Sequence, residues 1–224
     1  MDMDASPDVA TTRMTDALYR LAAWLSPAYP VGAFSYSHGL EWAIGSGAVS
    51  NRQTLQDWIK DCIEHGSGRN DAILLAAAWR DPNNDEIADL AAALQPSRER
   101  HLEALAQGAA FVATTAAAWG GVSADPVAYP VAVGRAASAH DVPIADTLVL
   151  FLHAFTANLV SVGVRLIPLG QTDGQRAVAD LMPICRAVAE EALAAGLDDI
   201  GGAAINSDIA SMKHETQNVR LFRS

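Results

Sequence analysis

Apolar side chains recur at intervals of three and four residues along most of the chain. The clearest run lies in 97–118, where Leu102, Leu105, Ala109 and Val112 fall on one helical face. No segment alternates apolar and polar residues with the β-branched enrichment that is typical of a half-buried strand. The pattern therefore predicts an all-α protein, a single compact helical bundle-like domain of about ten helices.

Capping and helix-breaking residues divide this pattern into elements. The first helix is predicted to begin near Thr15 and to end before Pro27, because proline disfavours a helical conformation in the residue that precedes it. Ser50 is the expected cap of a helix that Gly66 ends, and Ser97 is the expected cap of the long run described above. The many alanines indicate helices that pack at short range.

Three parts follow from these boundaries. Residues 1–14 carry acids where a signal peptide needs basic residues, and they lack an apolar core, so we interpret them as a disordered leader. Residues 15–205 form the helical domain, since neither a repeat nor a linker separates two cores. Residues 206–224 form a carboxyl-terminal helix and a tail expected to dock onto a partner.

Composition favours a folded protein that does not bind nucleic acid. Half of the 224 residues are apolar and only 18% are charged, whereas disordered proteins combine low hydrophobicity with high charge. The net charge of -11 argues against nucleic acid, because phosphate neutralisation needs clustered Lys and Arg. Cys62 and Cys185 stand far apart without a CxxC motif, so we expect two buried free thiols in a reducing cytoplasm.

One segment, 144–167, is nearly long and apolar enough to span a membrane. Asp146, His153, Asn158 and Arg165 interrupt it, and each would be costly in lipid without a partner. The central helix of an all-helical core has the same composition. We therefore interpret the segment as a core helix and His153 as a hydrogen-bonded core histidine.

Motifs for common chemistry are missing from the sequence. There is no GxxxxGK[ST] phosphate loop, no HExxH zinc motif and no GxSxG nucleophile elbow.

His38 and Glu41 are three residues apart on a predicted short helix, 37–46, where both could face one divalent cation. Two ligands do not make a specific site, so we favour a structural role for both and predict no metal site. The alternatives are a small helical metal-dependent enzyme, in which His38, Glu41 and His153 converge, and a generic helical adaptor.

Two segments are unusual. The loop 26–43 holds Phe34 and Tyr36 among small hydroxyl residues, which suits either aromatic residues buried in the core or a recognition surface. The carboxyl terminus places apolar Leu221 and Phe222 between two arginines, the combination of apolar anchor and charged rim expected of a docking surface.

These segments resemble the UreF family of urease accessory proteins. The resemblance rests on SPAYPVGAFSYSHGLEWA at 26–43, FLHAFTANLVSVGVRLIPLGQTDGQR at 151–176 and SDIASMKHETQNVRLFRS at 207–224, and it covers about residues 18–224. It implies a cytoplasmic, nucleotide-free scaffold that promotes nickel insertion into apo-urease and is not an enzyme. It also implies a homodimer that binds a UreD/UreH-type accessory protein and recruits the nickel-carrying UreG-type GTPase.

The resemblance assigns roles to two sets of residues. The expected contacts to the UreD/UreH-type partner are Ser211, Lys213, His214, Glu215, Gln217, Arg220, Leu221, Phe222 and Arg223. Contacts to the GTPase or to a metal path are expected from Phe34, Ser35, Tyr36, His38 and Glu41. We expect no cofactor, because nickel would pass without a tight site. The tail is expected to order fully only on the partner, with Leu221 and Phe222 filling apolar pockets.

Overall fold

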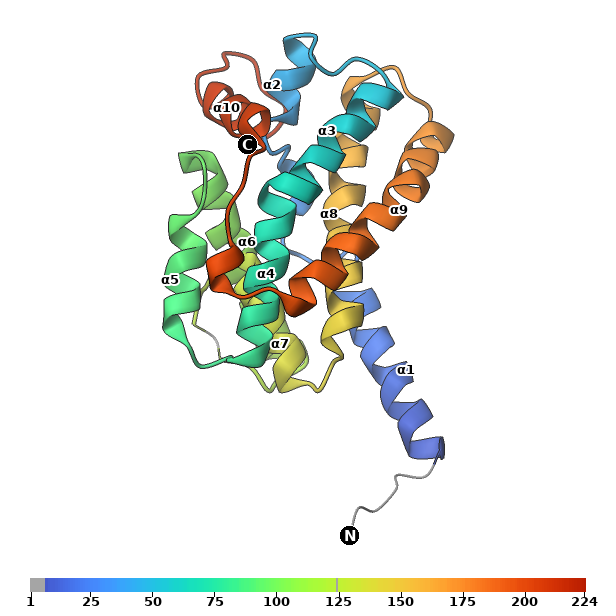
Figure 1. Ribbon diagram of the computed structural model, residues 1–224, viewed down its shortest axis with the longest axis vertical. Coiled ribbons are helices and arrows are strands. Elements are labelled where there is room, and N and C mark those ends of the chain that lie inside the picture. Colours follow the sequence, from blue (N-terminus) through green and yellow to red (C-terminus); the bar gives the residue numbers. More distant parts are fainter. Residues whose placement is uncertain (1–6, 124) are drawn as a thin grey trace.

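The computed structural model describes residues 7–123 and 125–224, and within these ranges it contains helices and no strand (Figure 1). The prediction of an all-α fold is thereby confirmed. In chain order the elements are α1 (Pro7–Trp24), η1 (Ala33–Ser35), α2 (Leu40–Gly45), α3 (Arg52–His65), α4 (Ser67–Arg80), α5 (Asp85–Ala93), α6 (Arg98–Ala118), α7 (Tyr129–Ala139), α8 (Ile144–Leu166), α9 (Gln171–Ala194), η2 (Leu197–Asp199) and α10 (Ile205–His214).

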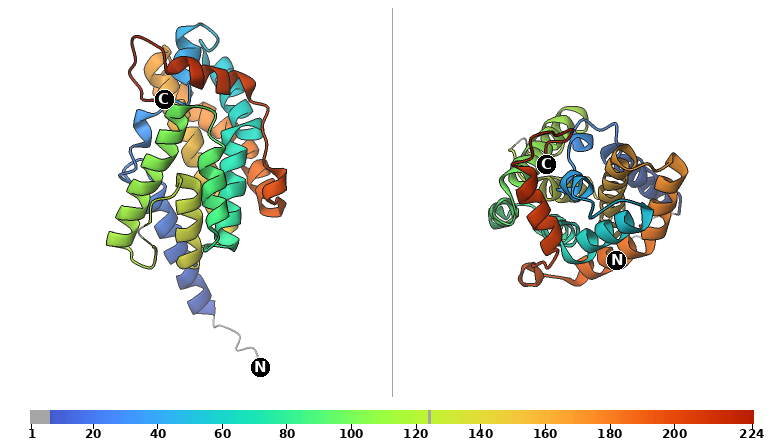
Figure 2. Two further views of the ribbon diagram at one scale, coloured as in Figure 1. Left: turned by 90° about the vertical axis from the view of Figure 1, so that its left-hand side faces the viewer. Right: turned by 90° about the horizontal axis from the view of Figure 1, so that it is seen from above.

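The long helices run along the long axis of the molecule. Helices α2 and α10 lie together at one end of the bundle, and the beginning of α1 extends beyond the other end (Figure 2). The carboxyl terminus returns to the end that holds α2 and α10. Helix α2 and the carboxyl-terminal segment, which lie far apart in the sequence, therefore meet at one end of the bundle.

Close helix packing, which the alanines predict, is clearest between α4 and α7. A Cβ atom added to Gly134 of α7 would lie 2.4 Å from the carbonyl oxygen of Leu75 in α4, so only glycine fits there. Aromatic rings fill the wider part of the core, where Trp24 meets Phe111 edge-on with ring centroids 6.0 Å apart. Both cysteines are free and buried, as expected, and burial raises the pKa of the Cys62 thiol to about 11.

Several helix ends agree with the sequence, whereas α1, α2 and α3 begin at other residues than predicted. Ser97 caps α6 by accepting a hydrogen bond from the Arg100 amide. Asn51, rather than Ser50, caps α3, because its side chain accepts the Thr54 amide while the Thr54 hydroxyl accepts from Asn51.

Helix α1 begins at Pro7, so the predicted leader 1–14 is wrong from residue 7 onward; residues 1–6 lie outside the described ranges. Proline suits the first helical position, where its missing amide hydrogen costs no helical bond. The prediction of a disordered leader did not take this property of Pro7 into account.

Helix α8 forms the centre of the bundle. By length and composition it could cross a membrane, but half of its most apolar stretch is buried within the fold. Leu148, Leu152 and Leu159 are fully buried, which agrees with the predicted core helix. His153 is exposed, so its interpretation as a core histidine is wrong. Helix α8 therefore has one solvent-exposed face, which the periodicity of its sequence did not identify.

Candidate docking site at the carboxyl terminus

Helix α10 packs against α2 at unusually short range. Gly39, which precedes α2, has φ of 77°, and an added Cβ would lie 2.5 Å from the backbone nitrogen of Ser211. Glycine is therefore needed both for the left-handed conformation and for the approach of α10. On the other side of α10, the Ser211 hydroxyl hydrogen-bonds the hydroxyl of Ser97, the cap of α6.

The buried carboxylate of Glu41 holds the tail that follows α10. It accepts hydrogen bonds from the backbone amides of Leu221, at 2.7 Å, and Phe222, at 3.0 Å. It also lies 3.0 Å from Nε2 of His214. Hydrogen bonds to an ionised acceptor are among the stronger ones in proteins, so Glu41 fixes the backbone of the tail.

His214 and Arg220 share a second carboxylate, Glu99 at the start of α6. Nδ1 of His214 lies 2.6 Å from Glu99 Oε2, and Nη1 of Arg220 lies 2.5 Å from Glu99 Oε1. The imidazole is fully buried between Glu41 and Glu99. Each ring nitrogen of His214 therefore faces a carboxylate oxygen, so the side chain joins α10 to both α2 and α6.

The tail also caps α6. Oε1 of Glu215 accepts a hydrogen bond from the backbone amide of Arg98 at 2.8 Å. This carboxylate satisfies an amide at the positive end of the helix dipole. The carboxyl-terminal segment is therefore tied to α6 by both side-chain and backbone groups.

The last residues pair with the loop around η1. The Arg223 amide donates to the carbonyl of Ser35 at 2.8 Å, and the Ser37 amide donates to the carbonyl of Ser224 at 2.8 Å. The Ser224 hydroxyl donates to Glu103 Oε2 at 2.6 Å. The two segments that the sequence singles out separately thus form one junction.

Phe222 is buried in this junction. Its side chain is 6% exposed, and the guanidinium carbon of Arg165 lies 4.3 Å from its ring centroid. Nη2 of Arg165 also donates to the carbonyl of Phe34 at 3.0 Å. Phe222 is therefore an internal anchor of the tail.

The predicted partner contacts divide into three groups by exposure. Lys213, Arg220, Leu221 and Arg223 are exposed, Glu215 and Gln217 are half-buried, and Ser211, His214 and Phe222 are buried. The tail is ordered on its own domain, which differs from the expectation that it orders only on a partner. Of the predicted apolar pair, Leu221 is available to a partner in this conformation and Phe222 is not.

An exposed apolar row, absent from the sequence-based prediction, lies on α10. Ile205, Ile209 and Met212 are 63%, 45% and 51% exposed, and their spacing of four and three residues places them on one face. Val219 and Leu221 add exposed apolar side chains on the tail. Helical spacing within 205–212 was the available signal, but spacing alone does not say whether a face is buried.

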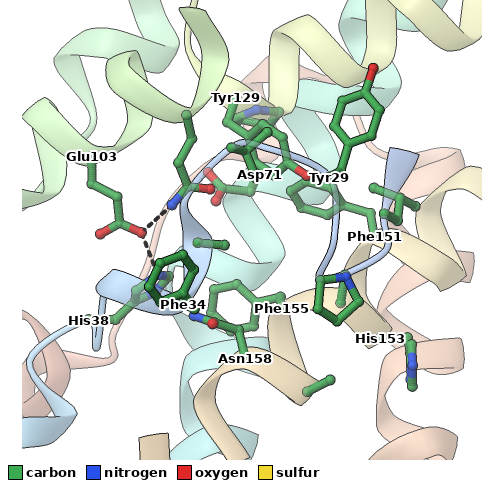
Figure 3. A pocket seen from close by; sticks show the side chains of 18 of the residues that line it. Tyr29, Phe34, His38, Asp71, Glu103, Tyr129, Phe151, His153, Phe155 and Asn158 are labelled. Carbon is green, nitrogen blue, oxygen red and sulfur yellow. Dashed lines mark hydrogen bonds and ion pairs between the residues drawn. The ribbon is translucent and has the colours of Figure 1, made fainter. Parts of the chain in front are cut away.

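The loop around η1 borders a cavity with a volume of about 220 Å³ (Figure 3). Phe34 is exposed at this cavity, whereas Tyr36, His38 and Glu41 are buried. Ser35 is half-buried and faces the tail through its carbonyl. Of the residues predicted to contact a GTPase, Phe34 alone has a largely exposed side chain.

Glu103 organises the buried charges at one end of this cavity. Nε2 of His38 donates to Glu103 Oε1 at 2.8 Å, and Arg100 forms an ion pair with Glu103 Oε2. Burial alone would raise the pKa of Glu103, but the charge of Arg100 and the hydrogen bonds from His38 and Ser224 lower it to about 2. Burial and the charge of Arg100 lower the pKa of His38, so its imidazole is neutral.

The residues of the predicted enzyme site do not converge. His38 has φ of 54°, lies outside α2 and bonds Glu103, whereas Glu41 lies within α2 and bonds the tail, so the predicted shared face is wrong. His153 lies across the cavity from His38 (Figure 3). Within the described ranges, no group of three or more His, Cys, Asp or Glu residues is arranged to hold a metal ion.

The fold and this site define a class: an all-α protein that binds its own carboxyl terminus and presents an apolar row beside it. A model of the UreF family matches residues 49–182. The urease accessory protein UreF of Rhodopseudomonas palustris strain HaA2 is 50% identical over 93% of this chain and 94% of its own length. The UreF of Cereibacter sphaeroides strain KD131 is 53% identical over 94% of this chain and 100% of its own length. The chain belongs to the UreF family of urease accessory proteins.

Proposed function

We propose that this chain is a non-catalytic scaffold in urease maturation. It binds a UreD/UreH-type accessory protein through α10 and the tail, and the pair recruits a UreG-type GTPase that carries nickel to apo-urease. Two copies of the chain form the working homodimer. Nickel is cargo in this scheme, and the chain supplies contacts rather than a tight metal site.

The apolar row on α10 is the observation that carries this proposal. Ile205, Ile209 and Met212 remain exposed, although the same segment is hydrogen-bonded to α2 and α6. Exposed apolar side chains on one face mark protein interaction sites. Lys213 and Arg223 of the same segment are exposed cations, which suits a partner with carboxylates at the rim of its site.

The buried residues of the tail support the same surface indirectly. Ser211, His214 and Phe222 bond or pack within the chain and hold α10 in place. Preorganisation of a docking segment lowers the entropy cost of binding. The family contacts predicted from sequence therefore separate into residues that touch the partner and residues that position the segment.

A matched pair of methionines tests the proposal. Met212 on α10 and Met182 on α9 are 51% and 47% exposed, so Met212→Asp and Met182→Asp place the same charge at similarly exposed sites. We expect Met212→Asp to reduce capture of the purified UreD/UreH-type partner by about tenfold or more, and Met182→Asp to leave it unchanged. Equal capture by both variants would contradict the assigned surface.

Urease activation provides the functional readout. Apo-urease, the UreD/UreH-type partner, the GTPase, GTP and nickel are combined with each variant, and urease activity is measured. The proposal expects activation to fall with Met212→Asp in parallel with partner capture. Full activation without any UreF-type chain would overturn the scaffold role itself. The molar mass of the chain alone, measured by light scattering, tests whether it forms the proposed homodimer.

A further inference from the structure

The cavity beside the loop 26–43 is lined by aromatic side chains and has no role in the proposed docking surface. Its walls carry aromatic side chains from three elements, including Tyr29, Tyr129, Phe151 and Phe155. The rings of Tyr129 and Phe151 lie 5.7 Å apart, and Phe155 meets the imidazole of His38 at 5.1 Å. Its volume of about 220 Å³ exceeds the roughly 150 Å³ of an apolar cavity that binds benzene.

One end of this cavity is polar and deeply buried. Asp71, Arg100 and Glu103 are all less than a tenth exposed and border the cavity, whereas Pro27 and Phe34 are exposed at its rim. The space therefore leads from an exposed rim to buried charged groups (Figure 3). Such a shape suits a ligand with an apolar body and one charged end.

The buried charges leave one carboxyl group without a partner. Arg100 is paired with Glu103, which also accepts hydrogen bonds from His38 and Ser224. No described residue donates a hydrogen bond to the Asp71 carboxyl group, whose pKa burial raises to about 7. A buried carboxylate normally has a cation or a set of donors beside it.

His38 adds a second acceptor without a donor. Its Nε2–H is used by Glu103, so Nδ1 of the neutral ring is a bare acceptor, and no described residue donates to it. The side chain of His38 is 9% exposed and borders the same cavity as Asp71. The polar end of the cavity thus offers two acceptors, the Asp71 carboxyl group and His38 Nδ1, and it holds two carboxyl groups beside the single guanidinium of Arg100.

We propose that this cavity binds a small organic cation, a primary ammonium group on an apolar or aromatic body. The ammonium group donates to the Asp71 carboxylate and adds a second positive charge, since the guanidinium of Arg100 alone faces both Asp71 and Glu103. The apolar body lies among Tyr29, Tyr129, Phe151 and Phe155, whose ring faces attract cations. This site is independent of the apolar row on α10 and of the urease scheme.

Binding of phenethylamine to the purified full chain tests the proposal. Its neutral counterpart, 2-phenylethanol, has the same ring and chain length but no charge. We expect calorimetry or ligand-observed NMR to show that the amine binds about tenfold more tightly than the alcohol. Equal affinities, or no amine binding at about 10 mM, would overturn the proposal.

Two aspartate variants locate the site. Asp71 lines both the aromatic cavity and a second, neighbouring cavity. Asp208 lines the second cavity but not the aromatic one. Asp71→Asn is expected to weaken amine binding about tenfold and to change alcohol binding little, and Asp208→Asn is expected to change neither. Loss of amine binding in Asp208→Asn, or its retention in a folded Asp71→Asn, would refute the assignment. If Asp71→Asn does not fold, the preference of the wild-type chain for amine over alcohol decides the question.

Discussion

The carboxylate of Glu41 accepts the backbone amide of Phe222 at 3.0 Å, across 181 positions of sequence. The same carboxylate accepts the amide of Leu221 and faces His214. One buried side chain on a short helix therefore determines the backbone path of the last residues.

Glu41→Gln is expected to loosen the tail without unfolding the bundle. The amide group keeps only one oxygen acceptor, so one tail amide loses its partner, and hydrogen bonds to charged groups contribute about 1.5–3 kcal/mol. Hydrogen exchange at Leu221 and Phe222 should accelerate, while exchange in α8 should not change. The exposed Glu190 provides the matched control, Glu190→Gln. Unchanged tail protection in Glu41→Gln would show that Glu41 does not hold the segment.

Gly39→Ala is expected to displace α10. Alanine at φ of 77° costs about 1–2 kcal/mol in any setting, and here its Cβ would also meet the Ser211 nitrogen at 2.5 Å. Gly47 has φ of 82° with open space around its Cβ position, so Gly47→Ala isolates the conformational cost alone. Urea denaturation and limited proteolysis of the tail should show a larger effect for Gly39→Ala. Equal effects would mean that α10 moves without cost.

Alanine substitutions at the neighbours Leu221 and Phe222 are expected to affect different properties, partner capture and stability respectively. Phe222→Ala should lower the free energy of unfolding by about 3 kcal/mol, because a buried aromatic ring is lost. Leu221→Ala should change stability by less than about 0.5 kcal/mol, since this side chain is 77% exposed, yet it should weaken partner capture. Urea denaturation and capture assays measure the two effects. A fully stable Phe222→Ala variant would contradict the internal role of this ring.

The pH dependence of stability should report Asp71. Burial raises its pKa to about 7 against the opposing charge of Arg100, so folding favours the protonated form. That contribution is fully present below the pKa of about 4 in the unfolded chain and is lost as pH rises through about 7. Asp71→Asn should therefore gain stability relative to wild type between pH 4 and pH 8, by at most about 4 kcal/mol.

A control separates Asp71 from other titrating groups. Asp198 is exposed, so Asp198→Asn removes one carboxylate outside the core and is the matched control variant. Glu103 acts in the opposite sense and at lower pH, because its pKa is lowered to about 2; its stabilising contribution is lost as pH falls below about 4.5. A pH-independent difference for Asp71→Asn would contradict the raised pKa.

Local signals in the sequence predicted the helical class and several helix ends. Ser97 as a cap, Gly66 as an end and the alanine pattern all act within one or two turns, so their consequences are readable without knowing the fold. The carboxyl-terminal segment was recognised by its unusual composition. What composition could not show was whether Phe222 faces the chain or a partner.

Long-range contacts were not predictable from the same signals. Glu41, Glu99 and Glu103 meet the tail only because the path of the chain brings α2, α6 and the carboxyl terminus to one end of the bundle. His38 and Glu41 share a helical spacing but not a helix, since the left-handed backbone at His38 precedes α2. Spacing arguments assume regular structure, and this loop breaks that assumption.

The apolar character of α8 has a consequence during synthesis of the chain. Helix α8 leaves the ribosome before α9, the helix that packs extensively along it in the finished fold. Until α9 follows, a stretch of sequence with the hydropathy of a membrane span is incompletely covered and accessible to chaperones or to other nascent chains. Fragments that stop before Gln171 should therefore aggregate, and production of the intact chain should depend on how quickly α9 is completed.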